Sequence, residues 1–169
     1  MSVNLKQGQL EVGQKLMILP GYRPAQAIGL YDNQGKPVGR IFCGSHGSIK
    51  LNLAHESQVD VGMVLTKRDD FKSVPVSNKL KVEIDFQPLE GQFVSNGYCC
   101  IMHIGTSTRQ VILERISCFD PTGQQGQKQL KPQMVSGPGK IWCTLYSQEP
   151  LPVQKGQQFV MRDENNNTY

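Results

Sequence analysis

The seven residues Leu80–Phe86, LKVEIDF, alternate without exception between apolar and charged side chains. Successive side chains of a β-strand point to opposite faces, so the apolar even-numbered positions and the charged odd-numbered positions lie on opposite sides of an extended chain. This pattern predicts a strand with one buried face and one hydrated face. The same alternation predicts a strand at Ile49–Leu53, and a nearly continuous apolar run predicts another at Lys15–Leu19.

Strand-like patterning continues through the rest of the chain, and no segment shows the periodicity of an amphipathic helix. Four further strands are expected, at Tyr98–Ile104, Arg109–Ile116, Lys140–Tyr146 and Gln158–Met161. Turn signals rich in Gly and Pro separate these segments. Short strands that recur about every ten residues between such turns are typical of barrels and sandwiches, so we expect an all-β protein.

Length and composition allow one large or two small domains, since the chain has 169 residues of which 38% are hydrophobic. The segment Lys67–Ser77, KRDDFKSVPVS, is charged, polar and contains a proline, which indicates a linker. We therefore expect two all-β units, at residues 1–71 and 75–169. The polar segment Asp120–Gln133 is expected to be the least ordered part of the chain.

The net charge of +4 describes a weakly basic surface. It is compatible with a partner near RNA but lacks the clustered Lys and Arg of a dedicated nucleic-acid-binding arm. No apolar run approaches the roughly 20 residues that a membrane helix needs, and no signal peptide opens the chain. The five cysteines form no regular framework, so we expect a reducing, cytoplasmic location and no membrane partner.

The stretch Ser95–Ser107, SNGYCCIMHIGTS, places two cysteines close to a histidine. Along a strand, Cys99 and His103 share a face but lie about 13 Å apart. A thiolate–imidazole pair needs a separation of about 3 Å, so these two side chains cannot activate one another. No Cys-x2-Cys spacing suggests zinc. We therefore assign no catalytic residue and no metal ligand, and expect buried thiols; a hydrolase that joins a cysteine and a histidine from different strands is kept as an alternative.

Nucleotide-binding motifs are missing from the chain. There is no Gly-x4-Gly-Lys-Ser/Thr loop, and Asn78–Lys81 lacks the acid of a guanine-reading motif. Gly44–Ser48, GSHGS, has the composition of an anion-binding loop, although a tight β-turn is the preferred interpretation. No cofactor is expected in this chain.

Four segments in the same order resemble one protein family. GQLEVGQKLMILP (Gly8–Pro20) and GSIKLNLAHESQVDVGMVL (Gly47–Leu65) resemble successive parts of the second domain of translational GTPases. LKVEIDF, followed by SNGYCCIMHIGTS, resembles the opening strands of the third domain. KGQQFVMRDENNNTY (Lys155–Tyr169) resembles the closing strand of that domain, in which a Phe precedes Arg-Asp.

The family is that of elongation factor Tu and eukaryotic elongation factor 1-alpha, with the release-factor and ribosome-rescue GTPases. The resemblance implies two consecutive closed Greek-key β-barrels of the domain II and domain III type, the first without its initial strands. Met102–Thr106 and Lys50–Leu53 are similar to the release and rescue members. The resemblance further implies that the parent protein is a GTPase and that GTP and Mg²⁺ belong to an absent GTP-binding (G) domain.

The resemblance also implies a rigid arm that binds a tRNA-shaped release or rescue factor and couples it to the protein's own G domain on the ribosome. Delivery of aminoacyl-tRNA is the alternative within translation. In the tRNA carriers of the family, Gly-Asp/Glu-Asn lies near the pocket for the terminal adenosine. The matching positions here are Gly44, Ser45 and His46, without the acid or the amide, which favours a protein partner.

Two sets of candidate contact residues follow from this resemblance. The partner-binding candidates match family motifs or the histidine strand: Gly97, Tyr98, His103, Arg162 and Asp163. Each candidate also has a purely structural alternative. Gly97 and Tyr98 would be a turn glycine and a packed ring, His103 a hydrogen-bonded barrel histidine, and Arg162 with Asp163 an ion pair. The candidates for proximity to ribosomal RNA are basic: Lys67, Arg68, Lys128, Lys131 and Lys140. Their alternative is ordinary exposure to solvent.

Overall fold

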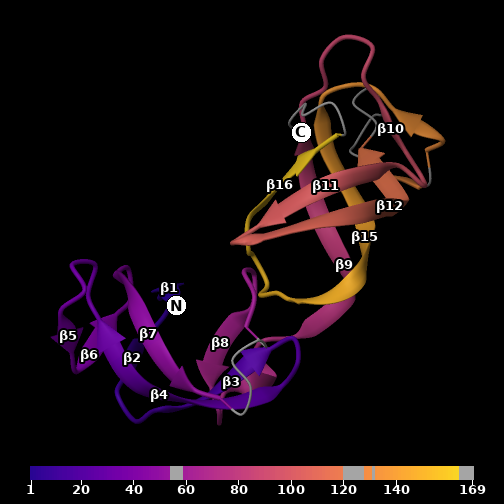
Figure 1. Cartoon of the computed structure of the whole chain (residues 1–169). Coiled ribbons are helices and arrows are strands. Elements are labelled where there is room, and N and C mark those ends of the chain that lie inside the picture. The colour runs from indigo at the N-terminus through magenta and orange to yellow at the C-terminus, as the bar shows by residue number, and fades with distance from the viewer. Residues whose placement is uncertain (54–58, 120–127, 131, 164–169) are drawn as a thin grey trace. The chain divides into compact units, whose positions relative to one another are not determined.

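The computed structural model of the chain describes residues 1–53, 59–119, 128–130 and 132–163. It divides into two compact units, Met1–Pro75 and Val76–Tyr169, at a point inside the polar segment 67–77. The all-β prediction is confirmed, because the elements of the described residues are strands apart from the 3-10 turn η2 (Phe71–Ser73) (Figure 1). No helix in this part of the chain is long and apolar enough to cross a membrane.

The first unit has eight antiparallel strands among its described residues. They are β1 (Ser2–Asn4), β2 (Gln9–Glu11), β3 (Lys15–Leu19), β4 (Arg23–Tyr31), β5 (Pro37–Val38), β6 (Arg40–Phe42), β7 (His46–Asn52) and β8 (Val64–Lys67). The main sheet has the order β1-β7-β4-β3-β8, with β5 attached to β4, and β2 pairs with β6 in a separate ribbon. His46 begins β7, so the predicted turn at 44–48 is shorter than expected.

The second unit also has eight strands among its described residues. They are β9 (Val76–Phe86), β10 (Val94–Ser95), β11 (Cys99–Ile104), β12 (Ser107–Phe119), β13 (Lys128–Leu130), β14 (Met134–Val135), β15 (Gly139–Pro152) and β16 (Phe159–Arg162). The main sheet has the order β16-β11-β12-β15-β9, with β13 attached to β12, and β10 pairs with β14. Most of the predicted loop 120–133 lies outside the described residues, but 128–130 form β13.

Neither sheet is closed within the described residues, which corrects the expectation of two closed barrels. Each sheet is a curled, open path that ends on two edge strands, β1 and β8 in the first unit and β16 and β9 in the second. Closure needs the two edge strands to share a ladder of hydrogen bonds. β1 has three residues and β16 has four, so each offers few backbone groups to such a ladder.

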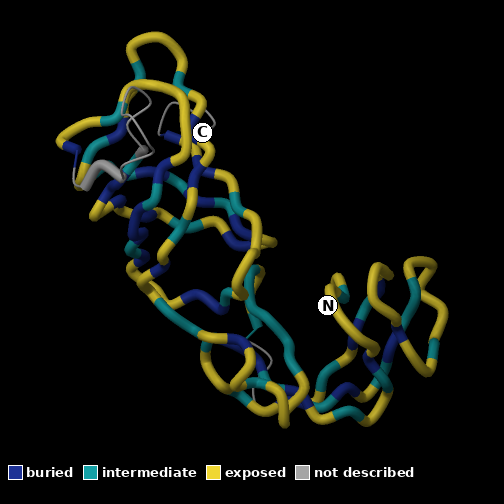
Figure 2. Tube along the Cα trace, turned by 180° about the vertical axis from the view of Figure 1, so that it is seen from behind, coloured by how far each residue is buried: buried dark blue, intermediate teal, exposed yellow. Residues whose placement is uncertain are grey.

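The predicted alternation of Leu80–Phe86 positions the core of the second unit. Buried and exposed residues alternate along its strands (Figure 2). Leu145 of β15 lies opposite Leu80 of β9 on one side and opposite Leu113 of β12 on the other. All three are buried, and Leu113 and Leu145 are fully enclosed. This leucine row joins three neighbouring strands through apolar contact that water does not reach.

The core of the first unit depends on β4, a strand that the sequence patterning misses. Pro24 reduces the strand signal, because proline cannot donate to a ladder and is rare inside sheets. A shift of register between Ala27 and Gly29 interrupts the alternation as well. β4 nevertheless pairs with both β3 and β7, so it is a central strand whose Ala27 and Leu30 are buried.

A bulge in β12 is tied to the turn that precedes β11. The register of β12 on β15 shifts between Glu114 and Ser117, and Arg115 has a φ of 53°. The backbone N–H of Ile116 donates to Asn96 Oδ1 at 3.2 Å. The N–H of Gly97, whose φ is 84°, donates to the carbonyl oxygen of Leu113 at 2.8 Å. The turn and the bulge therefore support one another, and Gly97 is needed there for its left-handed backbone.

Candidate partner-binding face

His103 stands on the outer face of the second unit's sheet. It lies on β11, directly opposite Thr108 of β12 and Val160 of β16. Its Nδ1 is 3.2 Å from Thr108 Oγ1, and the ring is half-buried. The imidazole is therefore held in place by its neighbour on β12 and still has a face open to solvent.

Further outward-facing side chains extend this face in both directions. Ile101 lies opposite Arg162 of β16, and Cys99 lies opposite Ile112 of β12. Val160 on the edge strand β16 and Ile112 on the inner strand β12 are 42% and 43% exposed, large fractions for apolar side chains. We call this set of outward-facing side chains the outer patch: Ile101, His103, Ile112, Val160 and Arg162. It combines apolar surface with one imidazole and one guanidinium.

The other three partner-binding candidates do not lie on this patch. Gly97 belongs to the turn before β11, and Tyr98 packs against the buried core of the second unit. Asp163 directly follows Arg162 but is buried, whereas Arg162 is exposed. The structure therefore brings together His103 and Arg162 and separates them from Gly97, Tyr98 and Asp163.

The five basic candidates are distributed over both units. Lys67 ends β8 and Arg68 follows it, and both are exposed residues of the first unit. Lys128 begins β13 of the second unit. Lys131 lies outside the described residues.

Lys140 on β15 is engaged by a neighbouring carboxylate. Its Nζ lies 2.6 Å from Glu83 Oε1, and Trp142 Nε1–H donates to Glu83 Oε2 at 3.1 Å. The hydrogen bond that Lys140 Nζ donates to Glu83 Oε1 lowers the pKa of the Glu83 carboxyl and raises the pKa of the Lys140 ammonium. Lys140 is thus less available to an RNA phosphate than an unpaired lysine.

The expectation of buried thiols on β11 is confirmed for Cys100, whereas Cys99 on the outer face is half-buried. Cys100 and Cys143 are 1% and 5% exposed. Burial raises the pKa of both thiols to about 12, so both stay protonated at neutral pH. Among the described residues, no group of three or more His, Cys, Asp or Glu side chains is placed to hold a metal ion.

Alkylation is expected to separate the cysteines by position. Cys43 is exposed, so iodoacetamide at pH 8 should modify it at least about tenfold faster than Cys100 or Cys143. Mass spectrometry of peptides after timed quenching measures the rates. In denaturant all five cysteines should react alike. Rapid modification of Cys100 in the folded chain would instead favour the alternative of a cysteine–histidine hydrolase.

The sequence patterning missed the apolar members of the outer patch. The alternation of side chains along β11 that places His103 on the outer face also places Cys99 and Ile101 there. The outward position of Ile101 could therefore be read from the sequence of β11 alone. Ile112 and Val160 come from strands whose register on β11 is needed to bring them alongside.

Comparison with known families locates a domain in the second unit. Residues 89–168 match the family model of the elongation factor Tu C-terminal domain. Over 167 residues, the chain is 22% identical to the eukaryotic peptide chain release factor GTP-binding subunit of Zygosaccharomyces rouxii and 21% identical to that of Kluyveromyces lactis. These alignments cover 95% of this chain but 25% and 23% of those proteins. The chain thus spans about a quarter of the length of the curated relatives it matches.

Solved structures share the fold. Sup35 complexed with GMPPNP matches 99% of this chain with a TM-score of 0.84 at 20% identity, using 41% of the Sup35 chain. Translation elongation factor SelB from Methanococcus maripaludis, in its apo form, matches 98% with a TM-score of 0.76 at 12% identity, using 38% of its chain. Residues 89–168 are therefore similar to the elongation factor Tu C-terminal domain family, and over nearly its whole length the chain is similar to release-factor GTP-binding subunits and shares its fold with Sup35 and SelB.

Proposed function

We propose that this chain is the β-barrel arm of a release-factor-type translational GTPase, and that its outer patch binds a tRNA-shaped protein factor. The parent protein would hold GTP and Mg²⁺ in a G domain outside this chain and act with the ribosome in the cytoplasm. The observation that carries the proposal is the outer patch: half-exposed Val160 lies opposite His103, Ile101 lies opposite Arg162, and half-exposed Ile112 extends the same face toward the start of β11.

The chemistry of the patch suits recognition of a protein. Interface cores are depleted of most charged residues but enriched in arginine, and their binding energy concentrates in a few central side chains. Here the imidazole of His103 and the guanidinium of Arg162 stand beside apolar surface rather than beside the lysine clusters that nucleic acids favour. This composition supports a protein partner over aminoacyl-tRNA, the alternative within the family.

A rigid sheet suits the proposed coupling. The strand that carries His103, β11, is hydrogen-bonded on both sides, by β12 and by β16. A patch on such a strand cannot move independently of the sheet, so a displacement of the whole unit would be passed to a bound factor. Lys67, Arg68 and Lys128 remain candidates for ribosomal RNA contacts in this proposal.

Single substitutions in the patch test the proposal. His103→Ala and Arg162→Ala are each expected to weaken binding of a purified tRNA-shaped release factor about 5- to 30-fold, because truncation of a central contact typically costs about 1–2 kcal/mol. Isothermal titration calorimetry with the chain measures the affinity. Lys155→Ala, an exposed residue in the turn before β16, is the matched control and should bind normally.

Trp142 fluorescence checks that each variant is folded, since this residue lies on β15 of the same unit. Unchanged affinity in both patch variants would remove the outer patch as the docking surface. Preference of the chain, rejoined to its G domain and GTP, for charged over uncharged tRNA would favour aminoacyl-tRNA delivery instead.

A further inference from the structure

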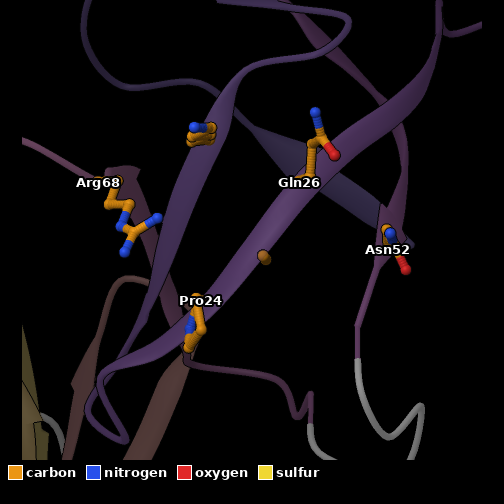
Figure 3. Close-up of a pocket in the computed structure, with 6 residues that line it drawn as sticks. Pro24, Gln26, Asn52 and Arg68 are labelled. Atoms are coloured by element: carbon orange, nitrogen blue, oxygen red, sulfur yellow. The ribbon is translucent and has the colours of Figure 1, made fainter.

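A shallow pocket of about 210 Å³ lies on the sheet of the first unit. Its lining combines two cations, two carboxamides and a small apolar surface: Lys15, Arg68, Gln26, Asn52, Pro24 and Ala25. Figure 3 shows Pro24 and Gln26 on one strand, with Arg68 and Asn52 on segments to either side of it. None of the residues in this pocket is a member of the outer patch, which belongs to the second unit.

The register of the strands places the four polar side chains in one row. Lys15 of β3 lies opposite Gln26 of β4, and Gln26 lies opposite Asn52 of β7. On the other side, the backbone N–H of Arg68 donates to the carbonyl oxygen of Lys15 at 3.1 Å. Neighbouring strands are about 4.8 Å apart, so the row crosses β7, β4 and β3 and ends at the residue after β8, with its two cations next to each other.

The two cations have no carboxylate partner in the part of the chain that the structure describes. The three ion pairs found there involve neither Lys15 nor Arg68. Asp69 and Asp70 follow Arg68 in the next turn without pairing to it. Like charges opposite one another destabilise a sheet, so this arrangement leaves an excess of positive charge that a bound anion would relieve.

The carboxamides add neutral donors beside these charges. Gln26 Nε2 donates one hydrogen bond, to the carbonyl oxygen of Gly13 at 3.0 Å, and has a second N–H. Asn52 is exposed, and its carboxamide makes no hydrogen bond to the other described residues. The pocket thus offers a guanidinium, an ammonium and two amide groups on one side of a ligand.

We propose that this pocket binds a phosphate group, carried as the terminal monoester of a nucleotide or sugar phosphate. A phosphomonoester has a second pKa of about 6 and is largely a dianion at neutral pH, which matches the two adjacent cations. Arginine binds phosphate oxygens through two parallel N–H groups, and the ammonium acts as a point charge beside it. The amides of Gln26 and Asn52 would donate to the remaining oxygens or to hydroxyls of the attached sugar.

A titration followed by NMR tests this site. The ¹⁵N-labelled chain is titrated with adenosine monophosphate, with inorganic phosphate and with adenosine. We expect the side-chain amide signals of Gln26 and Asn52 to shift with the two phosphates and not with adenosine. Lys15→Gln and Arg68→Gln should each weaken binding at least about fivefold, since each removes a charge-assisted contact.

Both residues are exposed, so the folded spectrum should be retained in the variants. Lys36→Gln, at the turn after β4, is the matched control and should bind like the unaltered chain. Equal affinity for inorganic phosphate and adenosine monophosphate assigns the site to the phosphate alone, and tighter binding of the nucleotide adds a sugar contact. Equal shifts with adenosine, or unchanged affinity in both pocket variants, would overturn the proposal. This experiment reports on the first unit alone. Its outcome is therefore independent of the docking function proposed for the outer patch of the second unit.

Discussion

Replacement of Leu113 by alanine is expected to destabilise the second unit by about 2–5 kcal/mol, the usual range for a fully buried leucine. Leu113 is completely enclosed and lies opposite Leu145 in the leucine row, so truncation leaves a cavity that rigid neighbouring strands cannot fill. Urea unfolding followed by the fluorescence of Trp142, the single tryptophan of the chain, reports on this unit.

Ile112→Ala is the matched control for this experiment. Ile112 is the neighbouring residue on β12, but it points outward and is 43% exposed. Its truncation removes a similar number of carbon atoms from a site that water already reaches, and we expect a loss below about 1 kcal/mol. Equal losses for the two variants would contradict the assignment of inner and outer faces.

Gly47→Ala is expected to have the second largest effect, on the first unit. A Cβ atom at Gly47 would lie 2.5 Å from the carbonyl oxygen of Tyr31 and 2.9 Å from Ile41 Cδ1. The contact with a backbone oxygen can be relieved only if β4 and β7 separate, because the oxygen has no rotamer of its own. Overpacking of this kind costs about 1–3 kcal/mol, and we expect a value at the upper end.

Hydrogen exchange of the amides of β4 and β7 measures this effect, since faster exchange reports local loss of stability. Gly39→Ala is the matched control, because a Cβ atom there meets nothing within 4 Å and the backbone is not left-handed. Its exchange rates should be those of the unaltered chain. Protection of β4 and β7 that survives Gly47→Ala would show that these strands pack less closely than the structure indicates.

Much of the strand content could be predicted from the sequence, since inner and outer faces alternate clearly. β3 has the predicted bounds, and β9, β11 and β16 begin or end within a few residues of them. β4 could not be predicted, because its position is decided by pairing with β3 and β7 rather than by its own pattern. The open edges could not be predicted either, since which strands end each sheet depends on tertiary pairing.

Part of the candidate site could be predicted from the sequence. Alternation within β11 indicates the outward face of His103, and alternation within the Arg162–Asp163 pair indicates that these two neighbours point to opposite sides. Association of His103 with Val160, some sixty residues away, requires the register of two strands. The pocket of the first unit required even more, since its row of side chains comes from three strands and the residue after a fourth, which only the folded sheet aligns.

The bulge in β12 has a consequence for how homologous chains vary. Leu113 and Ile116 are both buried although they are three residues apart, because Arg115 and Ile116 together face the single residue of β15 that lies between the partners of Glu114 and Ser117. A relative that lacks the position of Arg115 would restore plain two-residue spacing and still keep both apolar side chains inside. Single-residue deletions among related chains should therefore collect at this point, where an alignment gap leaves the interior unchanged.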